Sequence, residues 1–370
     1  IPRWEYGYCQ YGERTSIKDP KGRETKFLYD HRGRNIGREL PMGQKENRSY
    51  NSLGQLVKQT DFKGQTVEII YDTLGRKSAQ KYYTPGSITS TEEIRFSYDN
   101  MGRIQSIKQD GFGISEDGVS QSLLRETSYK YNSCGELTQI STPEGSVNYE
   151  YDAKTGAKTR VYTANSDVRY TYDALNRLKT VAVHMRAGIA LSTPEVKIGR
   201  AHDYTKVGSR ASVALPNGVT TNYRYDNLNR LTQLTHEKVG VPIASYSYEL
   251  LPTGRRAAVT EVTPEGSSEI RYTYDNLNRL TGEIRTGVKP FEASYAYDIN
   301  GNRIQKVIAG EDENDTINYT YNDNDQLTTE VSSANGTTVY GYDLNGSLIT
   351  KENTRSEERR VGKECRSRWS

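Results

Sequence analysis

The sequence has few of the residues that build a dry core or a covalent framework. Its 370 residues include 3 Cys, 3 Met, 2 Trp and 5 Phe, and the mean hydropathy is −0.84. Only Cys9 and Cys134 lie outside the last sixteen residues, and two thiols make no disulfide framework. Cys134 stands in a turn, where we interpret it as a small apolar side chain. The sequence therefore excludes a disulfide-stapled domain.

An excess of charge of one sign is also missing. The chain has 50 Lys and Arg against 47 Asp and Glu, for a formal net charge of +3. The last sixteen residues alone carry six Lys or Arg and three Glu, so the remainder is neutral. Binding of nucleic acid or of an anionic membrane requires clustered Lys and Arg. We therefore expect no nucleic-acid partner, and the sequence holds no apolar run long enough for a membrane span.

Catalytic constellations are absent as well. The four histidines, His31, His184, His202 and His236, have no acid, base or ligand partner at a recognisable spacing, and the zinc and triad signatures are missing. Turns of the type Asp-x-x-Gly lack the strand and helix that flank a phosphate-binding loop. We expect no catalytic residue, no cofactor and no metal site, so the chain is predicted not to be an enzyme.

Two acidic stretches leave one alternative open. Residues 311–315 (EDEND) and 322–325 (NDND) supply hard oxygen ligands that could attract Ca²⁺. Neither has the glycine and the distant bidentate Glu of an EF-hand loop, and residues 298–302 (DINGN) fail in the same way. Solvated turn residues are the favoured interpretation.

The sequence is rich in tyrosine, with 29 residues, and many of them stand in one recurring pattern. In residues 270–280 (IRYTYDNLNRL), Tyr272 and Tyr274 are two apart and project from the same face of a strand. Asp275 and Asn276 resist strand structure, and Asn278 tolerates a positive φ. The pattern predicts a strand that ends at Asp275, a tight turn, and a return strand from Leu280.

The same hairpin recurs fourteen times, at intervals of 20 to 33 residues and most often 21. The copies begin at Tyr29, Tyr50, Tyr71, Tyr98, Tyr131, Tyr151, Tyr172, Tyr204, Tyr225, Tyr248, Tyr274, Tyr297, Tyr321 and Tyr342. We expect the Tyr, the Asp and the Gly or Asn of the clearest copies to be structural residues of the turn: Tyr29, Asp30, Gly33; Tyr71, Asp72, Gly75; Tyr98, Asp99, Gly102; Tyr172, Asp173, Asn176; Tyr225, Asp226, Asn229; Tyr274, Asp275, Asn278; Tyr297, Asp298, Gly301; Tyr342, Asp343, Gly346.

A second kind of turn alternates with the first. Pro and Gly mark it, as in residues 19–22 (DPKG), 40–43 (LPMG) and 142–145 (TPEG). Each repeat is thus predicted to be two strands and two unlike turns, which gives an all-β antiparallel meander of about 28 strands. Open twisted sheets seldom exceed ~10 strands, so the sheet must wind. Two strands in about 21 residues fit a spiralling shell better than the four-stranded blade of a propeller.

The consensus Tyr-Asp-x-x-Gly/Asn-Arg-Leu at this spacing resembles the Rhs or YD-repeat family of bacterial toxin shells, insecticidal toxin complexes, wall-associated proteins and teneurins. The resemblance covers roughly residues 20–350. It implies a hollow β-shell that encloses another polypeptide. The self-cleaving Asp-Pro-x-Gly-Leu motif of some members is not matched, because Asp19-Pro20-Lys21-Gly22 continues with Arg23. No protease residue is therefore expected.

Both ends of the sequence depart from the repeat. The chain opens at Ile1 without Met or a signal peptide, and residues 355–370 resemble a translated sequencing adapter, with a natural basic tail as the alternative. We expect a shell segment over 1–354, truncated at both ends, and a non-native tail over 355–370 that makes few contacts.

Two functions from different classes remain. The first is a structural segment of a secreted or cell-surface bacterial protein, whose partners are the rest of its own shell and an enclosed C-terminal toxin or effector. The second is a surface adhesion or carbohydrate-binding protein, in which rows of Tyr would stack on glycans. We favour the first, because the charge is neutral, no catalytic constellation is found and the two-strand period is unbroken.

Overall fold

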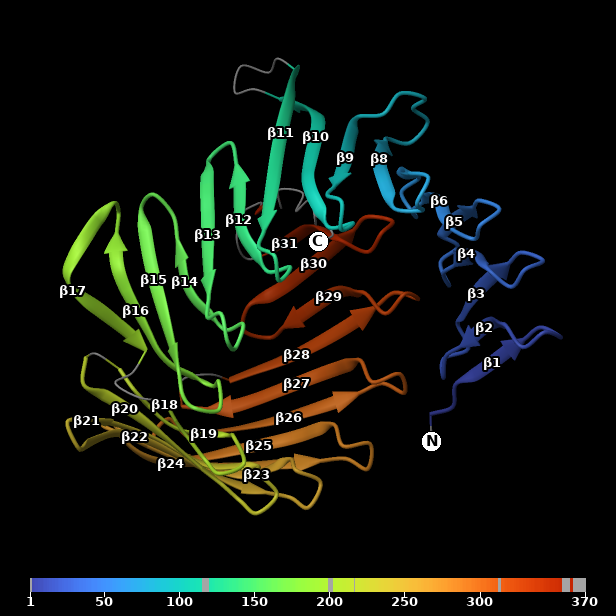
Figure 1. Ribbon diagram of the computed structural model, residues 1–370. Helices are drawn as coiled ribbons and strands as arrows, with labels where there is room; N and C mark the ends of the chain where they lie inside the picture. The colour runs from blue at the N-terminus through green and yellow to red at the C-terminus, as the bar shows by residue number, and fades with distance from the viewer. Residues whose placement is uncertain are drawn as a thin grey trace. The chain divides into compact units, whose positions relative to one another are not determined.

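The protein is a succession of antiparallel β-strands (Figure 1). The computed structural model describes residues 2–114, 120–198, 202–215, 217–311, 314–354 and 360–361. Within these residues there is no helix, and the registers run between strands that are consecutive in the sequence. The predicted all-β meander is confirmed.

The first sheet has 17 strands in the described residues. They are β1 (Glu5–Tyr8), β2 (Arg14–Lys18), β3 (Glu24–Tyr29), β4 (Asn35–Glu39), β5 (Lys45–Tyr50), β6 (Leu56–Thr60), β7 (Thr66–Tyr71), β8 (Lys77–Tyr83), β9 (Glu92–Tyr98), β10 (Ile104–Ile114), β11 (Ser120–Tyr131), β12 (Leu137–Thr142), β13 (Gly145–Tyr151), β14 (Lys158–Tyr162), β15 (Ser166–Tyr172), β16 (Leu178–Arg186) and β17 (Ile189–Ile198).

The second sheet has 15 strands, again counted over the described residues. They are β18 (His202–Tyr204), β19 (Arg210–Ala214), β20 (Val219–Tyr225), β21 (Leu231–Lys238), β22 (Val241–Leu250), β23 (Arg256–Thr263), β24 (Gly266–Tyr274), β25 (Leu280–Gly287), β26 (Phe291–Tyr297), β27 (Arg303–Gly310), β28 (Asn314–Tyr321), β29 (Leu327–Ser332), β30 (Gly336–Tyr342), β31 (Leu348–Asn353) and β32 (Arg360–Val361).

The chain groups into two compact units. Unit 1 comprises Ile1–Phe96, Gln109–Leu124 and Ala293–Ser370, and unit 2 comprises Ser97–Lys108 and Arg125–Glu292. Of the expected tail over 355–370, the structure describes Arg360 and Val361, which pair with Lys351 and Thr350 of β31. The rest of the tail lies outside the described residues, so its predicted lack of contacts stays a prediction.

The repeated turn is a three-residue hairpin loop with a bulge. In the copy at Tyr71, Gly75 N donates to Asp72 O at 3.0 Å, Asp72 N donates to Arg76 O at 2.8 Å, and the register shifts at Tyr71. A type I turn followed by a residue in the left-handed region gives this pattern. Gly75 has a φ of 77°, and Asn278 holds the equivalent place with a φ of 66°.

Two turns differ from their expected places. The turn after β22 begins at Leu250, because Leu251 N bonds Arg255 O and Gly254 N bonds Leu251 O. Leu250 and Leu251 thus hold the places expected for Tyr248 and Glu249. A further copy lies at Tyr8, where Cys9 N bonds Glu13 O and Gly12 N bonds Cys9 O. The sequence pattern did not identify this copy, because Cys9 stands where the motif has Asp.

The two kinds of turn are less unlike than the sequence suggested. Asp19 N bonds Arg23 O and Gly22 N bonds Asp19 O, which is the bonding of the Tyr-Asp turn. The turns at Leu40 and Asp61 repeat it. The Pro that stands in several of them fits this geometry, because it presets φ at the first corner of a type I turn. The same bonding therefore occurs at both ends of the strands. Residues 142–145 and 263–266 differ, because they form tighter two-residue loops in which Thr142 pairs with Gly145 and Thr263 with Gly266.

Little of the molecule is covered. Ten hydrophobic residues are buried among those described, and none of the large side chains described is fully buried. Few apolar side chains are thus covered in the described residues. Polar contacts must therefore contribute stability that a thick apolar core contributes in other proteins.

The left-handed turn position gives a direct prediction. Gly102 has a φ of 79°. Replacing Gly102 by Val should lower the free energy of unfolding by about 1–2 kcal/mol or more, because a β-branched residue resists positive φ. Gly102→Asn is the matched control and should cost far less, since Asn176 and Asn229 stand at 60° and 61°. Chemical denaturation measures both changes, and equal losses would contradict the account.

Candidate functional site: the turn contacts and the seam

The Asp of each Tyr-Asp turn fixes its own loop. Asp72 Oδ1 accepts the N–H of Leu74 and of Arg76, both at 2.9 Å, and Asp72 Oδ2 accepts from Arg76 Nε at 2.8 Å. The same set recurs at Asp30, Asp99, Asp173, Asp226 and Asp275. One carboxylate thus satisfies two backbone donors and orients one guanidinium. That these aspartates are structural residues of the turn stays a prediction.

The Arg that follows the Gly joins one turn to the next. Arg34 Nη1 donates to Asn51 O at 3.0 Å, and the Arg34 guanidinium lies 5.0 Å from the centroid of the Tyr50 ring. Arg103 contacts Asn132 O and the Tyr131 ring in the same way. The sequence showed this Arg as a recurrent polar residue, and its reach into the following repeat was missed.

The Tyr of the motif connects its repeat to the preceding repeat, whereas the Arg reaches the following one. Tyr274 Oη donates to Arg256 O of β23 at 2.9 Å, and Tyr50 Oη donates to Asn35 O of β4 at 2.8 Å. Equivalent bonds are made by Tyr29, Tyr71, Tyr131, Tyr151, Tyr172, Tyr204, Tyr225 and Tyr321. The acceptor is always the first residue of the preceding return strand. Each of these ten repeats is therefore bonded to its predecessor through a tyrosine ring that is half-exposed on the sheet.

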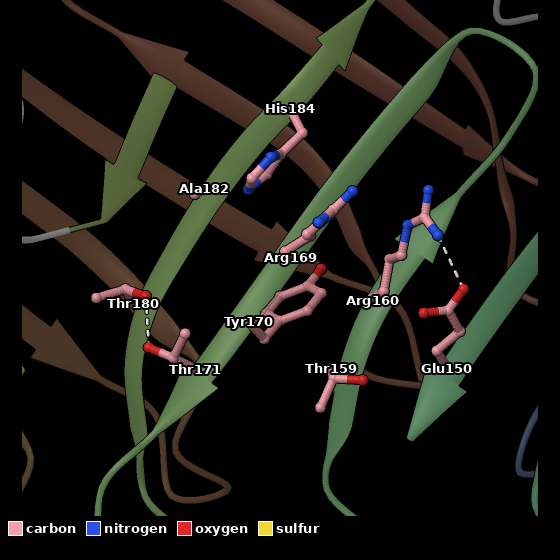
Figure 2. Close-up of a pocket in the computed structure, with 9 residues that line it drawn as sticks. All are labelled: Glu150, Thr159, Arg160, Arg169, Tyr170, Thr171, Thr180, Ala182 and His184. Carbon is pink, nitrogen blue, oxygen red and sulfur yellow. Dashed lines mark hydrogen bonds and ion pairs between the residues drawn. The ribbon is translucent and has the colours of Figure 1, made fainter. Parts of the chain in front are cut away.

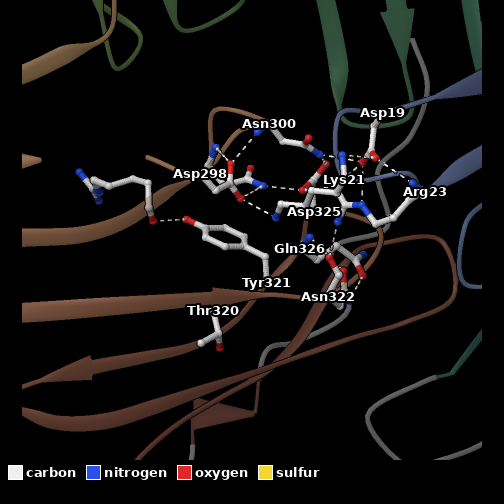
Figure 3. Close-up of polar contacts among 12 residues, drawn as sticks. Asp19, Lys21, Arg23, Asp298, Asn300, Thr320, Tyr321, Asn322, Asp325 and Gln326 are labelled. Carbon is white, nitrogen blue, oxygen red and sulfur yellow. Dashed lines mark hydrogen bonds and ion pairs between the residues drawn. The ribbon is translucent and has the colours of Figure 1, made fainter. Parts of the chain in front are cut away.

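In unit 1 the turns of the first strands meet those of the last strands. Arg23 Nε holds Asp19 Oδ2 at 2.6 Å, while Arg23 Nη1 donates to Asn322 O at 3.0 Å and Arg23 Nη2 to Asp325 Oδ1 at 2.7 Å (Figure 3). This is the contact that other arginines make with the next repeat. Here it joins turns about 300 residues apart in the sequence.

Further contacts join the same two rows of turns. We call the contacts between the turns at Asp19, Leu40 and Asp61 and the turns at Asp298, Asn322 and Asp343 the seam. Lys21 Nζ lies 2.5 Å from Asp298 Oδ2, and Asn300 Nδ2 donates to Asp19 Oδ2 at 2.7 Å. The turn at Leu40 follows, where Asn324 Nδ2 donates to Gln44 Oε1 at 3.1 Å. The turn at Asp61 meets the turn at Asp343 through Lys63 and Asn345. The two rows thus match turn by turn and in the same order, which sequence spacing could not reveal.

A shallow pocket of about 330 Å³ lies on the strands β13–β16 of unit 2 (Figure 2). Arg160 crosses it and bonds Glu150 Oε1 at 2.9 Å and the buried Asp167 at 2.8 Å. Tyr170 and His184 also line it. The charged groups Arg160, Glu150 and Asp167 are thus paired with one another.

The remaining candidates are consistent with structural roles. His236 Nδ1 lies 2.9 Å from Thr221 Oγ1, and His31 stands in a turn. Of the possible calcium stretches, residues 312–313 lie outside the described residues, Asp315 is buried and bonded to Ser332 and Ser333, and Asp325 belongs to the seam. Over the described residues, no group of three or more His, Cys, Asp or Glu is placed to hold a metal ion. Nor do they contain a helix fit to cross a membrane.

The fold and the turn contacts define a Tyr-Asp repeat segment. The family described as Teneurin YD-shell matches residues 81–191, and the family described as RHS Repeat matches residues 204–238. These matches confirm the resemblance to the Rhs/YD-repeat family. A comparison with curated protein sequences found no match.

Solved structures show the same fold. The crystal structure of TcdB2-TccC3 is 16% identical with a TM-score of 0.72, and the comparison covers 97% of this chain and 22% of that chain. The crystal structure of TcdB2-TccC3-Cdc42 is 16% identical with a TM-score of 0.72, and the comparison covers 96% of this chain and 21% of that chain. The structure of the Photorhabdus luminescens Tc holotoxin pore is 15% identical with a TM-score of 0.65, and the comparison covers 96% of this chain and 22% of that chain. The chain thus spans about a fifth of those chains. The predicted shell-type β fold is confirmed.

The turn aspartates predict how stability depends on pH. A side-chain hydrogen bond from Arg34 lowers the pKa of Asp30 to about 2, and the backbone N–H of Arg76 is the main cause that lowers the pKa of Asp72. A carboxyl whose pKa is depressed by folding stabilises the fold above its unfolded pKa of about 4 and stops doing so as pH falls toward the folded value. Stability should therefore decline below about pH 4.

Denaturation midpoints between pH 2 and pH 7 measure this decline. Asp30→Asn is the informative variant, because Asn51 and Asn132 hold the same place in other copies and the loop should still form. Its stability should fall less steeply between pH 4 and pH 2 than that of the parent. Identical slopes would show that the Asp30 carboxylate does not support the fold.

Proposed function

We propose that this chain is a non-catalytic segment of a shell that, in a complete Rhs-type protein, encloses a C-terminal toxin or effector. The observation that carries the proposal is the hydrogen bonding of the polar side chains that recur in the repeat. In the described residues, the Asp, Arg and Tyr of the repeat bond to the backbone and to one another, which supports a structural use of these recurring groups. A wall of this kind separates an interior from solvent by continuous strand pairing.

The fold likeness supports the proposal. Solved structures of TcdB2-TccC3 share this architecture over nearly the whole chain, and each contains two named components. An enclosed polypeptide would be a partner of this segment only as part of a longer protein, together with the remaining shell. We further propose a bacterial, secreted or cell-surface location for that protein.

Enclosure requires the seam to stay closed. A shell retains its contents only if adjacent rows of turns stay together, and Arg23 with Asp19, Asn322 and Asp325 holds two such rows in unit 1. Opening this contact should expose an enclosed segment without disturbing strand pairing elsewhere.

Limited proteolysis of the complete gene product tests this function. We expect the part that follows the repeats to resist digestion in the parent and to be cut severalfold faster in Arg23→Ala, because the seam is weakened. Arg95→Ala is the matched control, since Arg95 is exposed and its ion pair is with Glu93 on the same strand. Rapid digestion of that part in the parent would contradict enclosure, and equal resistance in all three would contradict the role of the seam. Tight binding of a glycan by the 370-residue chain would favour the adhesion alternative instead.

A further inference from the structure

Strands β3–β8 of unit 1 have two faces of different chemistry. Residues that stand directly opposite each other in an antiparallel sheet share a face, and the next residue along each strand lies on the other face. On one face, charged side chains of alternating sign stand opposite one another on successive strands. The registers place there Lys26, Glu39 and Lys45 on β3–β5, and Lys58, Glu68 and Lys81 on β6–β8. We call this the charged face.

The charged face is exposed. Lys45 Nζ lies 3.4 Å from Glu39 Oε2, Lys58 Nζ lies 3.6 Å from Glu68 Oε1, and the side chains of Lys45 and Lys58 are 64% and 51% exposed. A polypeptide packed on this face would remove water from these charges, and loose ion pairs do not compensate for that loss. The charged face is therefore suited to contact solvent.

The other face carries aromatic and aliphatic side chains. It holds the motif residues Tyr29, Tyr50 and Tyr71, together with Phe27, Val67, Ile69 and Tyr82. We call this the tyrosine face. The carboxylate of Glu46 on this face is buried and already paired, with Arg38 Nε at 3.1 Å and Arg48 Nη2 at 2.8 Å.

The tyrosine face keeps apolar surface that a further layer would cover. Phe27, Val67 and the three motif tyrosines are only half-buried. Antiparallel sheets commonly have one solvated face and pack the other against a further layer. Tyr50 Oη and Tyr71 Oη are already bonded to Asn35 O and Leu56 O, so an apolar partner would leave neither hydroxyl without an acceptor.

We propose that the enclosed polypeptide lies against the tyrosine face of β3–β8 and that the charged face is turned to the outside solvent. This inference rests on the proposed function, because enclosure requires one of the two faces of the wall to meet the enclosed segment. Covering aromatic and aliphatic carbon is favourable, whereas covering hydrated Lys and Glu is costly. The part of the enclosed segment that meets these strands is accordingly apolar.

Site-specific photo-cross-linking in the complete gene product tests which face meets the enclosed segment. Gln59 and Gln80 lie on the tyrosine face, and their sequence neighbours Lys58 and Lys81 lie on the charged face. Each strand thus supplies its own matched control. With benzoylphenylalanine in place of Gln59 or Gln80, we expect cross-links to the part that follows the repeats severalfold more often than with it in place of Lys58 or Lys81.

The outcomes separate this inference from enclosure itself. Cross-links to that part that are equally or more frequent from residues 58 and 81 would overturn the assignment of the faces, while its resistance to proteolysis would still support enclosure. Cross-links to it from neither face would overturn the assignment too, and rapid digestion of the same part would then contradict enclosure as well. Circular dichroism should show that all four variants retain the β fold.

Discussion

The carboxylate of the turn Asp is the group on which the rest of the structure depends. It accepts two backbone N–H groups of its own loop and holds one Arg, and that Arg reaches the backbone and the Tyr ring of the next turn. Since few apolar side chains are buried, these charge-assisted contacts replace part of the work of a core. A repeat without them would be a marginal hairpin.

The same contacts support the proposed role as part of a wall. The Asp, Arg and Tyr side chains that recur in the sequence form hydrogen bonds with neighbouring backbone groups and with one another. At the seam, Arg23 makes with Asn322 and Asp325 the contact that Arg34 makes with the following repeat. One local rule thus serves both consecutive hairpins and rows of turns that are distant in the sequence.

The strand period and the turn positions could be predicted because they depend on neighbours in the sequence. Asp72 and Gly75 specify their loop within five residues. Copies that depart from the consensus were misplaced or missed, as at Leu250 and Tyr8, because the backbone tolerates Leu or Cys where the pattern expects Tyr or Asp. The seam could not be predicted, since Asp19 and Asn300 are ordinary turn residues until the fold brings them together.

Consecutive repeats are held to one another through the Arg and the Tyr of the turn. A double-mutant cycle between Arg103 and Tyr131 tests it most directly, because the guanidinium lies 4.5 Å from the centroid of the ring in the next repeat. From unfolding free energies of the parent, Arg103→Ala, Tyr131→Leu and the double variant, we expect a coupling energy of about 0.5–1 kcal/mol. Strictly additive effects would contradict the account.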